Sequence, residues 1–170
     1  MLSKRMQEEL NKQINAEFWS AYLYLSMSAW FEDKNLAGFA NWMKVQYQEE
    51  TTHAMKIFDY VNERGGRVLL QPIAAVDTKW EDETDVFETT LKHEQKVTSL
   101  INNLVNIAIE EKDHATNNML QWFVEEQVEE ESNADEILQQ LKMLKGNPHG
   151  ILMLDRELKQ RTFIDEIKQI

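Results

Sequence analysis

Proline and glycine are scarce in this chain, and their scarcity constrains the fold more than any other feature. The 170 residues include 2 prolines and 5 glycines, so long segments run without a residue that would break a helix. These segments are rich in Glu, Gln, Lys, Leu and Met, which favour helix. Apolar residues recur in them at intervals of three and four, the period of an amphipathic helix. The sequence therefore predicts an all-α fold built from long helices.

Capping residues and helix breakers indicate where these helices begin and end. We expect long helices at about 3–32, 36–64, 82–111 and 114–145, and a shorter fifth helix at about 151–167. Ser3 is a suitable N-cap, and Gly65 with Gly66 offers a left-handed end to the second helix. Residues 65–81, which include Pro72 and several apolar side chains, can span a bundle as a packed crossover. The whole chain, 1–170, is expected to form one domain, and the fifth helix is expected to pack against neighbouring subunits.

Each long helix has one polar interruption about halfway along its apolar stripe. The interrupting residues are Glu17, Glu50 with His53, Glu94, and Gln127 with Glu130. Glu50 and His53 are three residues apart and therefore lean toward the same face of their helix. A buried carboxylate without a partner costs about several kcal/mol. Interruptions in all four stripes therefore indicate bound cations; the alternative is that the stripes are phased wrongly and these side chains face water.

The chemistry of the predicted ligands favours iron or manganese. The four glutamates carry four negative charges, which two divalent cations would balance, and Glu50 beside His53 is the natural bridge. Oxygen-rich ligation with one imidazole suits these ions better than structural zinc. Anionic oxygen ligands stabilise Fe³⁺ relative to Fe²⁺, so a ferrous pair would readily give electrons to O₂. Di-iron carboxylate bundles use two Glu-x-x-His pairs; here Gln127-x-x-Glu130 replaces the second pair, which favours a transit site over a fixed cofactor.

Composition excludes several other classes of function. The formal net charge of -12 disfavours nucleic-acid binding, which needs clustered Lys and Arg, and it suits the attraction of cations. The absence of cysteine excludes disulfides, iron–sulfur clusters and thiol nucleophiles. No apolar signal segment opens the chain and no stretch approaches a membrane span, so we expect a cytoplasmic protein without a membrane partner.

Several motifs together carry a family resemblance. They are Glu17 with Tyr24, Glu49-Glu50-x-x-His53, Lys92-His93-Glu94-Gln95, and Leu120-Gln121-Trp122-Phe123-x-x-Glu126-Gln127-x-x-Glu130. With these motifs the chain resembles the bacterial non-haem ferritins over essentially all its length. The resemblance implies a ferritin-like four-helix bundle with one long crossover and a short C-terminal fifth helix. It also implies a ferroxidase that oxidises Fe²⁺ with O₂ or H₂O₂ and stores Fe³⁺ mineral in a homo-oligomeric 24-subunit shell.

The same resemblance implies a role for each candidate residue. Two irons per subunit would be held by Glu17, Glu50 and His53 and by Glu50, Glu94 and Glu130, with Gln127 beside the second. A third iron site would use Glu49, Glu126, Glu129 and Glu130. Tyr24 matches a tyrosine near the centre, and Trp122 is a possible electron donor, although core packing also explains both. No haem is expected, because Thr51 stands where bacterioferritins place a haem-ligating methionine.

Two other functions fit the sequence. One is a soluble di-iron enzyme that reduces peroxide or oxygen and stores nothing. The other is an all-helical interaction protein whose acidic residues face solvent. The small DNA-protecting ferritin-like shells are disfavoured because they lack a fifth helix.

Overall fold

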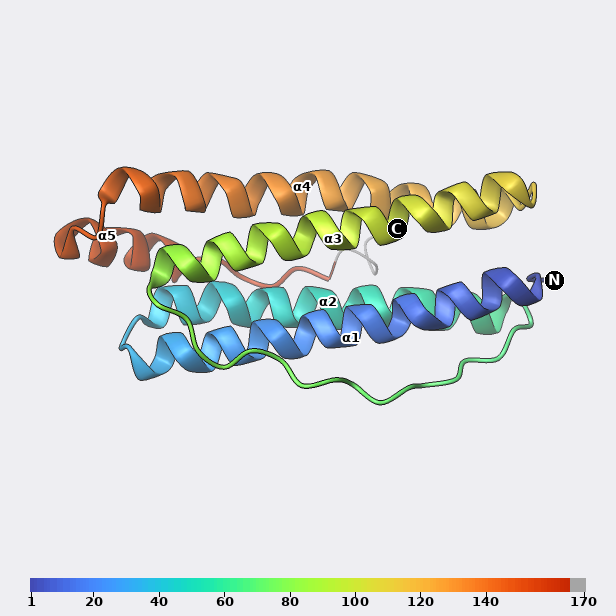
Figure 1. Cartoon of the computed structure of the whole chain (residues 1–170), viewed down its shortest axis with the longest axis horizontal. Helices are drawn as coiled ribbons and strands as arrows, with labels where there is room; N and C mark the ends of the chain where they lie inside the picture. Colours follow the sequence, from blue (N-terminus) through green and yellow to red (C-terminus); the bar gives the residue numbers. More distant parts are fainter. Residues whose placement is uncertain (166–170) are drawn as a thin grey trace. The chain divides into compact units, whose positions relative to one another are not determined.

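A computed structural model describes residues 1–165 as five helices, with no strand among them (Figure 1). The helices are α1 (Lys4–Asp33), α2 (Ala37–Glu63), α3 (Glu83–Glu110), α4 (His114–Leu144) and α5 (Pro148–Leu158). The all-α prediction is confirmed, and the ends of the four long helices differ from the predicted ones by one residue at most. None of the described helices combines the length and the apolar character needed to cross a membrane.

Short polar side chains start three of the long helices. Ser3 Oγ accepts a hydrogen bond from the Met6 amide at 3.0 Å, as its predicted role as an N-cap requires. Asp82 and Asp113 play the same part for α3 and α4. Gly65, with a φ of 71°, takes the left-handed conformation that ends α2. Local sequence therefore accounts for four of the eight ends of the long helices.

The chain divides into two compact units. The first contains Met1–Leu2, Asn11–Lys79 and the residues from Gly146 onward, and so holds most of α1 together with α2, the crossover and α5. The second contains Ser3–Leu10 and Trp80–Lys145, and so holds the first turns of α1 with α3 and α4.

In the first unit the crossover follows α1 (green in Figure 1), held by polar side chains of that helix. Asn11 Nδ2 donates to the Arg67 carbonyl and Asn11 Oδ1 accepts from the Leu69 amide, while Trp19 Nε1 donates to the Ala75 carbonyl. The expectation of a packed apolar crossover is wrong for the large side chains. Because the hydrogen bonds attach the crossover through its backbone, Leu69, Leu70 and Ile73 stay exposed.

A residue of α5 caps the N-terminus of α2. Its N-cap residue, Leu36, provides no side-chain hydrogen bond, and the Asp155 carboxylate instead accepts from the amides of Gly38 and Phe39 at 2.8 and 3.1 Å. This anion at the helix N-terminus satisfies two donors that the helix itself leaves open. A Cβ on Gly38 would lie 1.6 Å from the Asp155 carbonyl oxygen, so no larger residue fits here.

The fifth helix differs from its predicted range of 151–167. It begins at Pro148, because Asn147 accepts from the amides of His149 and Gly150 and proline suits the first helical turn. It ends at Leu158, because the chain beyond is held by Asn41, whose Nδ2 donates to the carbonyls of residues 158, 159 and 161. Positions 166–167 of the predicted helix lie outside the described residues.

In the second unit α3 and α4 pack as a helical pair. Lys112 turns the chain between them with a φ of 57°. The N-terminal turn of α1 joins the end of α3 through an ion pair of 2.8 Å between Arg5 and Glu110. The apolar stripes of the two helices are buried, including Phe87, Ile101, Leu104, Leu120, Phe123 and Ile137.

Candidate metal centre

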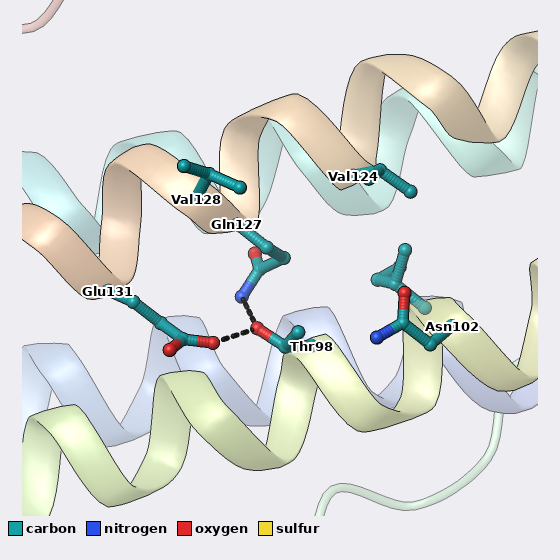
Figure 2. Close-up of a pocket in the computed structure, with 7 residues that line it drawn as sticks. Thr98, Asn102, Val124, Gln127, Val128 and Glu131 are labelled. Carbon is teal, nitrogen blue, oxygen red and sulfur yellow. Dashed lines mark hydrogen bonds between the residues drawn. The ribbon is translucent and has the colours of Figure 1, made fainter.

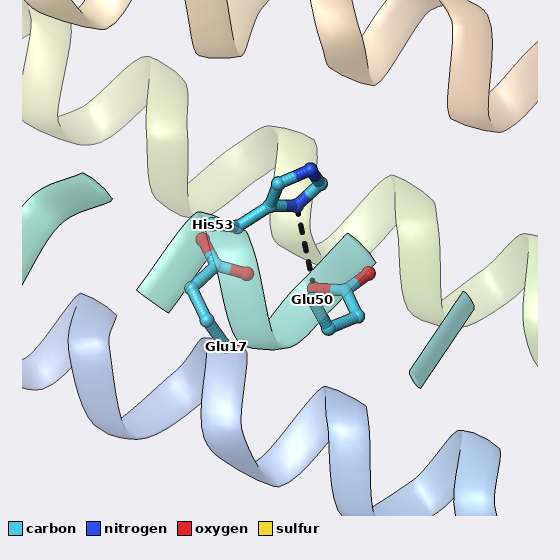
Figure 3. Close-up of side chains that lie close together, drawn as sticks. All are labelled: Glu17, Glu50 and His53. Atoms are coloured by element: carbon cyan, nitrogen blue, oxygen red, sulfur yellow. Dashed lines mark ion pairs between the residues drawn. The ribbon is translucent and has the colours of Figure 1, made fainter. Parts of the chain in front are cut away.

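Glu17, Glu50 and His53 form a buried polar group in the first unit, which we call the histidine group (Figure 3). Each offers one ligand atom, and the three atoms lie within 4.8 Å of one another. Glu17 comes from α1, and Glu50 and His53 come from successive turns of α2, as their three-residue spacing requires. His53 Nδ1 lies 3.6 Å from Glu50 Oε2. All three are at most 4 % exposed, so the predicted burial of these polar residues is correct.

Burial sets the protonation of the histidine group. It lowers the pKa of His53 to about 4, and the charge of Lys56 lowers it further in the same direction. The imidazole is therefore neutral at pH 7 and has a ring nitrogen with a lone pair for a cation. Burial raises the pKa of Glu17, and hydrogen bonds with Gln13 and Glu50 oppose that rise. A bound cation would compensate the burial of both carboxylates.

Gln13 supports the histidine group, although it was not predicted as a site residue from the sequence. Its Nε2 donates to Glu17 Oε1 at 2.8 Å from one turn earlier on α1, and Gln13 is itself buried. The other oxygen, Glu17 Oε2, is buried and accepts no hydrogen bond within residues 1–165. The signal that could have found Gln13 is its position four residues before Glu17 on the same helical face. One oxygen of Glu17 is thus oriented by the protein, and the other remains available to a ligand.

Glu94 and Gln127 make a second buried polar contact in the second unit, and together with the buried Glu130 we call them the glutamine group. Gln127 Nε2 donates to Glu94 Oε2 at 3.1 Å and approaches Thr98 Oγ1 at 3.4 Å. Glu130 is buried three residues after Gln127 on α4, so the two lean toward one face. The Glu94 carboxylate therefore accepts a hydrogen bond from the protein even when no metal ion is bound.

A solvent-open pocket of about 290 Å³ borders the glutamine group (Figure 2). Thr98 Oγ1 donates to Glu131 Oε1 at its edge and accepts from Gln127, so a chain of hydrogen bonds leads from the pocket to Glu94. Thr98 and Glu131 were not predicted as site residues, although each lies four residues after a predicted one, Glu94 and Gln127, on the same helical face. The pocket is otherwise lined by Ile101, Asn102, Val124 and Val128.

The remaining predicted residues have varied surroundings. Tyr24 is fully buried on α1, seven residues and thus two turns after Glu17. Trp122 is half-buried and packs edge-on against Phe123, with ring centroids 4.8 Å apart. Of the residues predicted for a third iron, Glu126 is half-buried and Glu129 exposed. Glu49 lies 2.6 Å from Arg161, in an ion pair that the sequence pattern did not predict.

The histidine group has the composition of a site for a divalent cation that also takes part in chemistry. Two carboxylates and one neutral imidazole would balance one divalent ion with three protein ligands. Structural zinc sites are usually closed by four ligands, often thiolates, whereas three ligands leave positions for water or an oxidant. The residues thus fit a redox-active cation such as iron.

Known proteins similar to this chain agree with its helices and motifs. A family model described as a ferritin-like domain matches residues 7–144. A bacterial non-heme ferritin of Bacteroides fragilis is 45% identical over 161 residues, covering 95% of this chain and 100% of the relative. A humanized archaeal ferritin structure is 51% identical with a TM-score of 0.96, covering 96% of this chain and 99% of that one. An open pore ferritin from Archaeoglobus fulgidus is 49% identical with a TM-score of 0.94, covering 95% and 100%.

These matches extend over nearly the full length of the relatives as well as of this chain. The fold class is therefore a ferritin-like four-helix bundle with one long crossover and a short fifth helix, as predicted. The family assignment made from the motifs is likewise confirmed: this chain belongs to the ferritin family and is similar to the bacterial non-haem ferritins.

Proposed function

We propose that this chain is a ferroxidase that stores iron. In the reaction two Fe²⁺ ions each lose one electron, and O₂ takes up both electrons with two protons to give H₂O₂; H₂O₂ can serve as the oxidant in turn. The Fe³⁺ produced is deposited as mineral. The observation that carries the proposal is the histidine group, whose ligand atoms lie within 4.8 Å of one another. Membership of the ferritin family supports the storage of iron.

The two buried groups would take different parts in this reaction. We assign the first Fe²⁺ to Glu17, Glu50 and His53, with Gln13 holding one oxygen of Glu17. The second Fe²⁺ is assigned to Glu94 and Glu130, with Glu50 as the shared ligand and Gln127 beside them; this assignment rests on the family resemblance. A third iron position at Glu49, Glu126, Glu129 and Glu130 rests on the same resemblance, as do the roles of Tyr24 and Trp122 near the centre.

We also propose that the chain acts as one ferritin-like domain within a 24-subunit homo-oligomeric shell in the cytoplasm. Exposed apolar side chains on α1 and the crossover support assembly, because soluble monomers rarely expose such groups together. A hollow of about 400 Å³ lies between these two segments, lined by residues that include Tyr22, Leu25 and Val76. The exposed side chains are Tyr22, Leu25, Leu69, Leu70 and Ile73.

A ferroxidase assay tests the reaction. Protein loaded anaerobically with Fe²⁺ and then exposed to air should oxidise the iron faster than buffer while consuming O₂. The double variant Glu50→Ala/His53→Ala should lose about a hundredfold or more of that rate, because metal ligands are removed. The matched control Glu63→Ala/His149→Ala removes the same side-chain types at exposed positions and should oxidise iron like the parent. Equal rates for parent and Glu50→Ala/His53→Ala would contradict the proposed centre.

Size and mineral loading test the shell. Gel filtration should place the parent at hundreds of kilodaltons, and the iron retained after desalting should far exceed three ions per subunit. A small oligomer that oxidises Fe²⁺ but retains no mineral would instead identify a di-iron oxidase. A protein that neither binds Fe²⁺ nor gains thermal stability from it would favour an interaction role.

A further inference from the structure

The segment after α5 places a cation on a predicted metal ligand. Arg161 Nη2 lies 2.6 Å from Glu49 Oε2, and both side chains are about one-fifth exposed, at 22% and 20%. Glu49 immediately precedes Glu50 on α2 and lies one turn before His53. A charged hydrogen bond of this length and partial burial is stronger than an exposed ion pair.

Three other contacts hold Arg161 at this position. Its guanidinium carbon lies 4.5 Å from the centre of the Trp42 ring, within the range of a cation–π contact. Its Nη1 donates to the Trp42 carbonyl at 3.5 Å, and Asn41 Nδ2 donates to the Arg161 carbonyl at 2.9 Å. Backbone, ring face and carboxylate thus all contribute to the placement of this one side chain, which is oriented before any metal binds.

We infer that Arg161 is a positioning residue that competes with metal ions for Glu49. This inference rests on the proposed function, in which Glu49 belongs to a third iron position. A cation can use Glu49 Oε2 only after the guanidinium has moved away, because both need the same oxygen and repel each other. The competition weakens the third position and leaves the histidine group unaffected, so a cation leaves the third position more readily than the histidine group.

The separation of the two sites follows from the contacts. Arg161 contacts Trp42 and Glu49, whereas in the histidine group Gln13 holds Glu17, and none of these contacts of Arg161 involves a member of that group. Removing the guanidinium should therefore change one class of metal site only. A role confined to anchoring the chain end would change thermal stability and leave every metal affinity as it was.

Calorimetric titration of metal-free protein with Zn²⁺, a probe without redox chemistry, tests the inference. Arg161→Ala should tighten the weakest class of sites by about tenfold, the loss expected for one charge-assisted competitor. The tight sites should not change. Arg156→Ala, which removes an exposed arginine from α5 of the same unit, is the matched control and should behave like the parent. Arg161→Gln, which keeps much of the side chain, should give most of the effect if Arg161→Ala folds poorly.

Glu49→Ala completes a double-mutant cycle. It should abolish the weak class, and Arg161→Ala should then have no further effect on Zn²⁺ binding. In the parent, Zn²⁺ should also increase amide hydrogen exchange in residues 158–165, and Glu49→Ala should remove that response. Weak-site affinities that stay equal in the parent and in folded Arg161→Ala or Arg161→Gln would overturn the inference. If the parent protein shows no tight Zn²⁺ sites, that result would instead overturn the proposed function.

Discussion

The histidine group and the glutamine group contain similar residue types but are prepared differently for a cation. In the histidine group one oxygen of Glu17 is held by Gln13, and the imidazole of His53 is neutral at pH 7. In the glutamine group Gln127 donates directly to Glu94 Oε2, so one carboxylate oxygen already has a protein partner. From this difference we expect the histidine group to bind a cation first and more tightly, because the glutamine group would have to exchange a hydrogen bond for a metal bond.

Acid should destabilise the metal-free protein through one buried histidine in each unit. Burial lowers the pKa of His53 and of His93 to about 4, and Lys56 and Lys96 add to the effect. The unfolded chain takes up protons near pH 6.5 and the folded chain only near pH 4, so stability is lost as pH falls through that window. Each histidine contributes about 3 kcal/mol to this loss.

Urea unfolding at pH 7 and pH 4 measures this loss of stability. The variants His53→Gln and His93→Gln should each flatten the pH dependence, and exposed His149→Gln serves as the control. If only one of the two buried variants flattens it, the two units differ in how closely they exclude water.

Ligand removal should affect the two groups unequally. His53→Ala should weaken the tightest Fe²⁺ site by about a hundredfold, since it deletes a metal ligand. Gln127→Ala should change binding by about tenfold at most, because Gln127 is an amide that neutralises no charge and its removal also frees Glu94 Oε2. Anaerobic Fe²⁺ titration monitored by calorimetry separates them, and equal losses would break the proposed order of binding.

A carboxylate at position 127 should make the glutamine group depend on a bound cation, as we expect for the histidine group. Gln127→Glu places a second acid beside Glu94 and removes the donor, so the metal-free protein should lose about 2 kcal/mol at pH 7. Divalent cations should recover that loss. Gln139→Glu makes the same change beside Asp135 on the exposed face of α4 and should cost only about a few tenths of a kcal/mol. Thermal unfolding with and without Zn²⁺ measures both.

The smallest effects concern the residues that hold the ligands. Gln13→Leu removes the 2.8 Å hydrogen bond to Glu17 and should weaken Fe²⁺ binding by about threefold. Thr98→Val removes a longer contact to Gln127, at 3.4 Å, and should change binding by less than about twofold. Matched Fe²⁺ titrations of the two variants give the comparison, and a larger effect of Thr98→Val would show that the pocket edge controls the glutamine group.

The sequence predicts contacts that repeat with the helical period and fails where distant segments meet. The period placed Glu17, Glu50, His53, Glu94 and Glu130 among buried residues, because burial of a long helix depends on a face that local spacing defines. The same reasoning extended α5 too far, since its end is decided by Asn41 in another helix. The contact between Arg161 and Glu49 could not be predicted from the helical period either, because the two residues are 112 positions apart in the sequence.

Apolar content was equally uninformative for the crossover. Leu69, Leu70 and Ile73 suggested a packed segment, yet the chain there is attached through its backbone and leaves these side chains exposed. Composition alone therefore does not reveal whether these side chains are buried; the hydrogen bonds from α1 show that the crossover is attached through its backbone.

The contact of Asp155 with the amides of Gly38 and Phe39 has a consequence for biosynthesis. The first turn of α2 leaves the ribosome more than a hundred residues before the carboxylate that completes it. The first turn of α2 therefore keeps two unsatisfied amides until α5 has been translated. A chain truncated ahead of α5 would lack this carboxylate, and the first turn of its second helix should fray and be cut more easily by proteases.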